Sequence, residues 1–217
     1  MDTLSSRLKS LKTLAGASGS FDTARAPNTP QALFVEWLDA ALTAGAQEPQ
    51  VMTLSTVRGD GSPDARSVVL LDVDERGWQF AASAASPKGR QLAERPQAAL
   101  TFYWPALAMQ IRLRGMIERL PDDIGTADFF SRPERSRAAI LAGHQSEPLN
   151  DPADLQNAIQ AQLARIAAQP QLASPHWSLY ALAPQEAEFW RSDADRRFTR
   201  LLYRRSGQQW ERCLLWP

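Results

Sequence analysis

The feature that most constrains the fold of this chain is a series of short segments in which apolar and polar residues alternate, the pattern of half-buried β-strands. Turn-forming stretches separate them, for example Gly-Asp-Gly-Ser at 59–62. Short connections permit antiparallel pairing, whereas a parallel pair needs a long crossover, so we expect an antiparallel meander curled into a barrel. The expected strands cover residues 51–57, 66–73, 78–83, 98–104 and 110–120, with two or three more around 178–190, 198–205 and 210–215.

Helical patterns accompany these strands and make the expected fold class α+β. Thr29 can cap a helix with Pro30 at its first position, and apolar residues then recur at helical spacing from Leu33 to Leu42. We expect a short helix after Ser86. Further expected helices cover residues 121–130, 132–141 and 151–168.

The domain organisation follows from a change in composition near residue 28. Residues 1–28 are polar, and the stretch Ala-Pro-Asn-Thr-Pro at 26–30 lies at their end. This composition is typical of a loosely held segment. We therefore expect a flexible N-terminal arm over 1–28 and a single domain over 29–217.

The charge balance narrows the classes of partner. Among 217 residues, 24 Lys and Arg stand against 24 Asp and Glu, which gives a net charge of zero. A protein that neutralises nucleic-acid phosphates carries a basic excess, so no nucleic-acid partner is expected. The most apolar stretch, 98–111, falls short of the ~20 residues of a membrane-spanning helix. With a single cysteine, Cys213, and no signal-peptide pattern after Met1, we expect a cytoplasmic protein without a membrane partner.

Several kinds of catalytic site find no support in the sequence. His144 and His176 are the only histidines, so no metal site is expected. Ser136 and His144 could be drawn as a nucleophile and its base, but no serine lies in a G-x-S-x-G pattern. There is also no P-loop and no G-x-G-x-x-G motif. We interpret both histidines as ordinary loop residues.

Cationic residues lie where a barrel would otherwise be apolar. Arg66 begins the run Ser-Val-Val-Leu-Leu, where a guanidinium is costly unless it meets an anion or water. Lys88 follows a strand at the start of a helix, whose free amide groups favour anions. Gln110, Arg112 and Arg114 form a polar face on one strand. Each alone fits a solvated edge or a surface ion pair, but together they indicate a ligand that carries a phosphate.

An ordered set of segments resembles the pyridoxamine 5′-phosphate oxidases and their flavin-binding relatives, from about Leu33 to Pro217. Each segment alone is a weak signal, and their order and spacing carry the likeness. The segments are residues 66–77, Gln110-Ile-Arg-Leu-Arg-Gly with Glu118-Arg-Leu, Phe130 to Ser136, Gln145-Ser146, Glu188-Phe-Trp190, Arg196, Arg200, Tyr203-Arg-Arg and the closing stretch from Trp210 to Pro217.

The resemblance implies an antiparallel split β-barrel with surrounding helices and a homodimer that holds FMN at the subunit interface. Arg66 and Lys88 would face the flavin phosphate and form charge-assisted hydrogen bonds with it. The glutamine at 110 would bond the flavin ring, and the tryptophan would offer a flat surface, although a core position is its commoner fate. The positions that would contact FMN are Arg66, Lys88, Gln110, Gln145, Ser146, Trp190 and Arg200.

The substrate half of the family pattern is only partly present. Arg132 and Ser136 stand where the family holds the substrate phosphate, and Arg196 stands where it orients the substrate, which makes Arg196 the expected catalytic residue. Phe198 replaces a histidine near the reacting carbon and could stack on the flavin or on an apolar substrate. Other replacements are Leu71 for a lysine, Asp128 for a tyrosine, Pro87 for an arginine, and Ala81 and Ala82 for a tyrosine and a threonine.

The resemblance therefore implies an FMN-dependent oxidoreductase like pyridoxamine/pyridoxine 5′-phosphate oxidase. A hydride would pass from a small substrate, with or without a phosphate, to FMN, and dioxygen would reoxidise the flavin with release of peroxide. The replacements leave open a divergent reductase or oxidase with another substrate, or a dimeric FMN-binding module without catalysis.

Overall fold

The structure is a computed structural model that describes residues 3–11, 13–14, 19–193, 195 and 197–217. Its helices are α1 (Leu4–Ser10), α2 (Pro30–Thr43), α3 (Pro87–Glu94), α4 (Asp122–Ser131), α5 (Glu134–Ala142) and α6 (Pro152–Ala168), with short 3-10 turns at Thr23–Arg25 and Pro105–Leu107. Its strands are β1 (Val51–Val57), β2 (Pro63–Val69), β3 (Asp72–Asp74), β4 (Gly77–Ser83), β5 (Gln97–Trp104), β6 (Met109–Arg119), β7 (Trp177–Ser192), β8 (Phe198–Ser206) and β9 (Gln209–Leu214).

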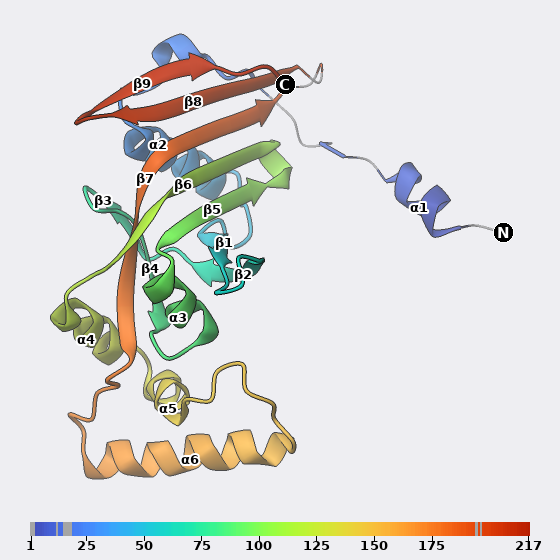
Figure 1. Ribbon diagram of the computed structural model, residues 1–217. Helices are drawn as coiled ribbons and strands as arrows, with labels where there is room; N and C mark the ends of the chain where they lie inside the picture. The colour runs from blue at the N-terminus through green and yellow to red at the C-terminus, as the bar shows by residue number, and fades with distance from the viewer. Residues whose placement is uncertain (1–2, 12, 15–18, 194, 196) are drawn as a thin grey trace. The chain divides into compact units, whose positions relative to one another are not determined.

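The described strands form one sheet with the order β2-β1-β5-β6-β7-β4-β3, and β8 and β9 continue from β7 (Figure 1). The strands whose register is resolved are antiparallel, as expected: β3 with β4, β4 with β7, β7 with β8, and β8 with β9. The expectation of a meander was wrong, because β4 pairs with the distant β7. This pairing joins segments far apart in the sequence, and no local turn signal indicates it.

The expected strand 66–73 is two strands. β2 ends at Val69, and β3 then folds back on β4, with Asp72 opposite Gln79. A tight turn joins β3 to β4 at Gly77, which has φ +120° and whose absent Cβ leaves room for the carbonyl oxygen of Leu182. The apolar run through this region continues without a break, so its pattern does not reveal the change of partner.

The chain folds into two compact units, which we describe separately. Unit 1 comprises Met1–Met52, Leu100–Leu113 and Gln185–Pro217. Its core is aromatic: Phe34 of α2 lies 4.9 Å from Phe102, and Trp37 lies 5.2 Å from Phe189, between ring centroids. Near the start of the chain, no described residue of α1 is buried. Closer to the boundary predicted at residue 28, the hydroxyl of Tyr203 donates to the carbonyl of Pro27 at 2.7 Å.

Unit 2 comprises Thr53–Ala99 and Arg114–Pro184. Here α3 begins against the end of β4, where Ser86 caps the helix by accepting from the amide of Gly89 at 3.2 Å. Helices α5 and α6 pack side by side (Figure 1), and buried Ala138, Ile159 and Ile166 form the contact between them. Unit 2 carries the cavity described below.

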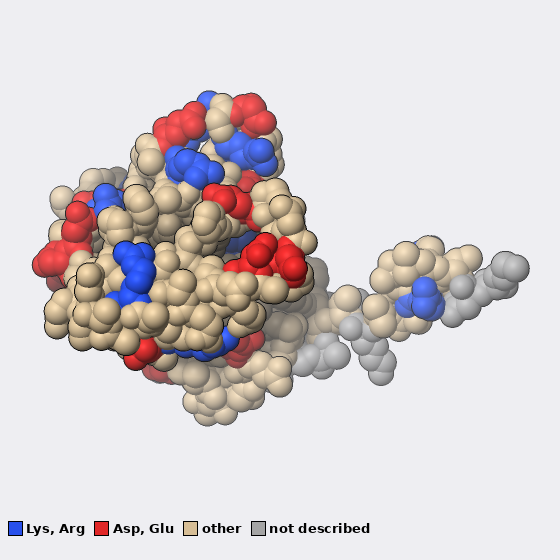
Figure 2. Space-filling view, turned by 90° about the horizontal axis from the view of Figure 1, so that it is seen from below, with Lys and Arg blue, Asp and Glu red and all other residues tan. Residues whose placement is uncertain are grey.

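Charges are dispersed on the face of the molecule that Figure 2 shows, where α6 lies nearest the viewer. Lys and Arg alternate with Asp and Glu there, and no broad patch of one sign appears. In the described part of the chain, no helix is long and apolar enough to cross a membrane. Among the same described residues, no group of three or more His, Cys, Asp or Glu is placed to hold a metal ion.

Candidate functional site

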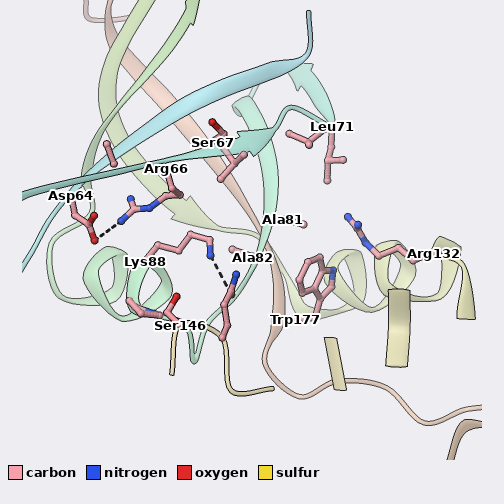
Figure 3. Close-up of a pocket in the computed structure, with 15 residues that line it drawn as sticks. Asp64, Arg66, Ser67, Leu71, Ala81, Ala82, Lys88, Arg132, Ser146 and Trp177 are labelled. Atoms are coloured by element: carbon pink, nitrogen blue, oxygen red, sulfur yellow. Dashed lines mark hydrogen bonds and ion pairs between the residues drawn. The ribbon is translucent and has the colours of Figure 1, made fainter. Parts of the chain in front are cut away.

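The candidate site is a cavity of about 620 Å³ in unit 2 (Figure 3). Strands β2 and β4, the start of α3 and the loop after α5 provide most of its wall. Four residues predicted from the sequence to contact the cofactor line it, and one predicted to contact the substrate does so too. These lining residues are Arg66, Lys88, Gln145, Ser146 and Arg132.

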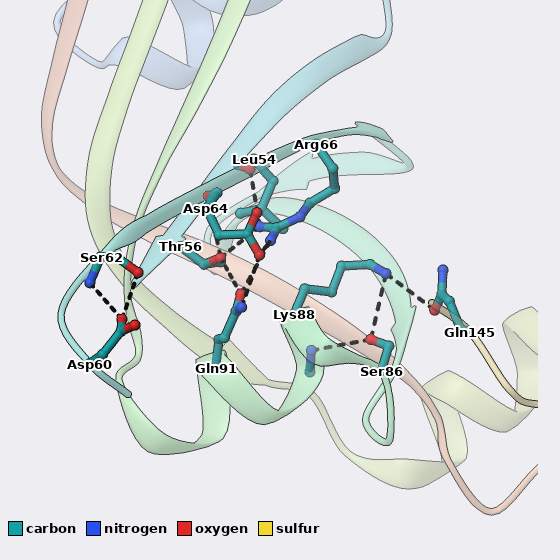
Figure 4. Close-up of polar contacts among 11 residues, drawn as sticks. Leu54, Thr56, Asp60, Ser62, Asp64, Arg66, Ser86, Lys88, Gln91 and Gln145 are labelled. Carbon is teal, nitrogen blue, oxygen red and sulfur yellow. Dashed lines mark hydrogen bonds and ion pairs between the residues drawn. The ribbon is translucent and has the colours of Figure 1, made fainter. Parts of the chain in front are cut away.

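Arg66 is held in place by a network of polar side chains (Figure 4). Its guanidinium donates to the hydroxyl of Thr56 at 2.6 Å and to the amide oxygen of Gln91 at 3.2 Å, and it pairs with Asp64 at 2.7 Å. Gln91 in turn donates to Asp64 at 2.9 Å. Thr56 and Gln91 are buried, so the network fixes the direction of the guanidinium before any ligand binds.

Asp64 stays ionised in this network. The hydrogen bond from Gln91, followed by the charge of Arg66, holds the pKa of Asp64 below its usual value. The charge of Arg66 is thus balanced within the protein, and its side chain lines the cavity.

Lys88 is the cation in the cavity whose charge is not balanced. Its ammonium contacts the amide oxygen of Gln145 at 3.2 Å and the hydroxyl of Ser86 at 3.5 Å, and it forms no ion pair with any described carboxylate. Burial, followed by the nearby charge of Arg66, lowers the pKa of Lys88 below the usual lysine value. Because Lys88 has no carboxylate partner among the described residues, it gives this end of the cavity a positive charge, which suits an anion.

The loop after α5 brings Gln145 and Ser146 to this end of the cavity. The chain reverses direction there, and Ser146 has φ +71°, in the left-handed region. Ser146 lines the cavity, and Gln145 accepts from Lys88. The loop therefore supplies neutral polar groups beside the two cations.

Arg132 lines the opposite end of the cavity and is already paired. Its guanidinium donates to both carboxylate oxygens of Asp128, at 2.8 and 3.2 Å. The indole N–H of Trp177 donates to the same carboxylate at 2.7 Å, and the guanidinium carbon lies 4.7 Å from the centroid of a Trp177 ring. Ser136, predicted beside Arg132, is exposed on α5 and does not line this cavity.

A second hollow, of about 380 Å³, lies in unit 1. It contains the remaining residues predicted to contact the cofactor or substrate, apart from Ser136, which lines neither hollow, and Arg196, which lies outside the described residues. The lining residues are Gln110, Arg112, Glu188, Trp190, Phe198, Arg200 and Pro217.

Arg200 in this hollow is bound by a buried acid. It donates to Glu188 at 2.8 Å and to the carbonyl of Trp216 at 2.7 Å, and Arg112 approaches the other oxygen of Glu188 at 3.2 Å. The hydrogen bond to Glu188 holds the pKa of Arg200 above its usual value. Beside it, the rings of Trp190 and Phe198 stack at 5.6 Å with an interplanar angle of 23°.

Sequence reasoning missed the residues that hold these side chains in position. The contact of Asp64 with Arg66 could have been predicted, because Asp64 lies two residues before Arg66 and therefore on the same face of β2. The contacts of Gln91 with Arg66 and of Glu188 with Arg112 join distant segments of the chain, and the local sequence does not indicate them. Glu188 and Arg200 lie closer in sequence, on the paired strands β7 and β8.

Comparison with known sequences gives matches along most of the chain. The family described as pyridoxamine 5′-phosphate oxidase matches residues 38–191, and its C-terminal dimerisation region, described for pyridoxine 5′-phosphate oxidase, matches residues 177–217. The chain belongs to the pyridoxamine 5′-phosphate oxidase family. Curated relatives named pyridoxine/pyridoxamine 5′-phosphate oxidase include one from Ectopseudomonas mendocina, 41% identical over 89% of this chain and 91% of that protein. Another, from Burkholderia lata, is 42% identical over 87% of each protein.

Solved structures of this family share the fold. A crystal structure of PhzG from Burkholderia lata 383, in complex with tetrahydrophenazine-1-carboxylic acid, has a TM-score of 0.86 and 30% identity, covering 93% of this chain and 100% of that one. A pyridoxamine 5′-phosphate oxidase-related, FMN-binding protein from Nostoc punctiforme has a TM-score of 0.70 at 18% identity, covering 87% and 98%. These likenesses confirm the predicted α+β fold with a curled, antiparallel split-barrel sheet.

Proposed function

We propose that this oxidoreductase of the pyridoxamine 5′-phosphate oxidase family uses FMN, and that the flavin phosphate binds between Arg66 and Lys88. The carrying observation is the half-buried ammonium of Lys88, which has no carboxylate partner in the described chain and lies beside a second cation. A phosphate would relieve the repulsion between the two cations and accept charge-assisted hydrogen bonds from both. The residues of this end of the cavity therefore fit the phosphate of FMN.

We further propose that the protein acts as a homodimer whose site draws on both chains. The match of residues 177–217 to a dimerisation region supports this assembly. The hollow of unit 1 would supply Gln110, Trp190 and Arg200 to the cofactor. Glu188 and the carbonyl of Trp216 fix Arg200, so it would act with a set direction.

When held by the residues above, FMN would supply two-electron redox chemistry: the substrate would lose a hydride from carbon and a proton from the neighbouring heteroatom, and dioxygen would take up two electrons and two protons as hydrogen peroxide. The protein's part is to position the reacting groups. Arg66, held by Thr56, Gln91 and Asp64, sets the position of the cofactor. Arg132 and Trp177 form the far wall that the substrate would meet. Arg196 remains the residue we expect to orient the substrate.

The names of the relatives make pyridoxine and pyridoxamine 5′-phosphate the first substrates to test. A second candidate, oxidation or reduction of a different compound, is favoured by the pairing of Arg132 with Asp128. The relative PhzG, crystallised with tetrahydrophenazine-1-carboxylic acid, has a ligand without a phosphate.

The visible spectrum of the purified protein tests the cofactor. We expect a flavin band near ~450 nm, and a colourless protein that gains no band with added FMN would refute FMN binding. The loaded protein is then supplied with pyridoxine 5′-phosphate, and peroxide is measured. No turnover at millimolar substrate would exclude that substrate. Stable FMN that no donor reduces would favour a binding module without catalysis.

A further inference from the structure

The cavity in unit 2 has two ends of different character. Figure 3 shows Arg66 and Lys88 at one end, Arg132 and Trp177 at the other, and Ala81 between them. The first end has an unbalanced cation, as described above. The second end has a cation whose charge the protein itself has balanced.

The pairing of Arg132 leaves little capacity for an anion. Two of its three guanidinium nitrogens donate to Asp128, and the side chains of the pair are only 28% and 16% exposed. Asp128 also accepts from the indole of Trp177, so Arg132 and Trp177 together fix this carboxylate. A phosphate that approached Arg132 would meet the fixed negative charge of Asp128 at close range.

The surroundings of the pair are apolar. Leu71 and the small side chains of Ala81 and Ala82 line the same cavity. The guanidinium carbon of Arg132 lies over the Trp177 ring at 4.7 Å from its centroid, and both residues line the cavity, so an aromatic side chain stands at this end. An apolar and electrically neutral wall suits an uncharged aromatic ring.

We propose that Asp128 is a specificity-determining residue: by neutralising Arg132 it makes this end of the cavity a site for an uncharged aromatic portion of the substrate, and it excludes a phosphate. The inference rests on the proposed function in one respect, namely that the substrate meets the cofactor in this cavity. It predicts a substrate that has an aromatic ring and no phosphate ester.

The test compares pyridoxal with pyridoxal 5′-phosphate, two probes that share a ring and differ in the phosphate. Each is titrated into the FMN-loaded protein, and the change in flavin absorbance gives Kd. For the native protein we expect the two Kd values to agree within about threefold. For Asp128→Asn, which keeps an acceptor for Trp177, we expect the phosphate ester to bind about tenfold tighter or more, with pyridoxal unchanged.

Two further variants show whether the effect acts through Arg132. In the double variant Asp128→Asn with Arg132→Ala, pyridoxal 5′-phosphate should lose the tighter binding that Asp128→Asn alone is expected to give. Asp123→Asn removes the same charge from an exposed position of α4 and should leave the ratio of Kd values unchanged. Thermal unfolding of each variant checks that it folds.

The inference is overturned if the native protein binds the ester a hundredfold tighter than pyridoxal, if Asp128→Asn changes nothing, or if its gain persists without Arg132. Failure of FMN binding would refute the proposed function instead. In that case the same pair of probes is measured by calorimetry on protein with Lys88→Met. That substitution removes the cation at the other end of the cavity, and the same ratios then decide the inference.

Discussion

Lys88 is the single residue on which the proposed cofactor site most depends. Replacing it by methionine keeps a similar length and removes the charge. Since a hydrogen bond to a charged group contributes about 1.5–3 kcal/mol, we expect FMN to bind about tenfold to a hundredfold more weakly. Quenching of flavin fluorescence measures this change. Lys9→Met, at an exposed position of α1, is the matched control and should bind FMN normally.

The lowered pKa of Lys88 also predicts how FMN binding depends on pH. Burial and Arg66 disfavour the charged form, so Lys88 loses its proton below the usual lysine value of 10.5. FMN affinity should be full while Lys88 is protonated and should decline as pH rises through the lowered pKa. Lys88→Arg should extend the full affinity to higher pH, because arginine stays protonated. A native affinity that stays constant up to pH 10.5 would contradict this assignment.

Gln91 stabilises the fold through the network around Arg66. Its replacement by leucine removes partners of Thr56, Arg66 and Asp64 at once. Leaving buried polar groups without partners costs about 1–3 kcal/mol each, so we expect the free energy of unfolding to fall by at least that amount. Urea unfolding measures it. Gln160→Leu, at an exposed position of α6, should change the midpoint little, and equal effects of both substitutions would refute the role of the network.

Sequence reasoning reached the cations of the site but not their partners. Arg66 and Lys88 were predictable because a charge at the end of an apolar strand and a lysine at a helix start are unusual locally. The pairing of Asp128 with Arg132 could have been predicted as well, since residues four apart on a helix are neighbours. The contact of Gln91 with Arg66 could not, because it arises only when distant segments pack.

At the scale of elements, the contact of α3 with the end of β4 positions Lys88. A Cβ at Gly89 would lie 2.4 Å from the carbonyl oxygen of Ser83 and 2.5 Å from that of Ala84, and backbone atoms cannot move aside cheaply. Gly89→Ala should therefore destabilise the protein by about 1–3 kcal/mol and weaken FMN binding together.

Gly59→Ala is the control for Gly89→Ala. A Cβ at Gly59 would approach only the flexible carboxylate of Glu94, at 3.2 Å, and we expect little change in stability or FMN affinity. Thermal unfolding and flavin fluorescence measure both variants. A Gly89→Ala protein of native stability and affinity would show that α3 can move without consequence for Lys88.

The elements themselves were largely predictable, and the exceptions have a common cause. The helix 151–168 and the strand 51–57 agree with α6 and β1 to within a residue, because each has a clear period and clear end signals. The run 66–73 failed because its division depends on which strand each half pairs with. Which distant strands pair depends on the tertiary structure, and a local pattern does not show it. The expectation of a meander was wrong for the same reason.

At the scale of the whole molecule, the neutral net charge led us to expect no polyanion as partner, but it carried no information about self-association. The expectation of a homodimer came from the family likeness, and the match of residues 177–217 to a dimerisation region now supports it. That region ends in exposed apolar side chains: Leu214 is 64% exposed and Trp216 is 92% exposed. A large apolar side chain with this exposure is expected to be covered by a second copy of the chain.

We therefore expect the FMN-loaded protein to sediment at twice the mass of one chain, and Trp216→Glu to shift it toward the monomer. A carboxylate buried at an interface pays for desolvation, so the dissociation constant of the dimer should rise about tenfold or more. Because the proposed site draws on both chains, FMN should be lost from Trp216→Glu at dilutions where the native protein retains it. Gln209→Glu adds the same charge to an exposed position of β9 and should leave the dimer intact. If Trp216→Glu remains a dimer, the C-terminal tryptophan lies outside the interface; if it becomes a monomer that still holds FMN, the cofactor needs only one chain.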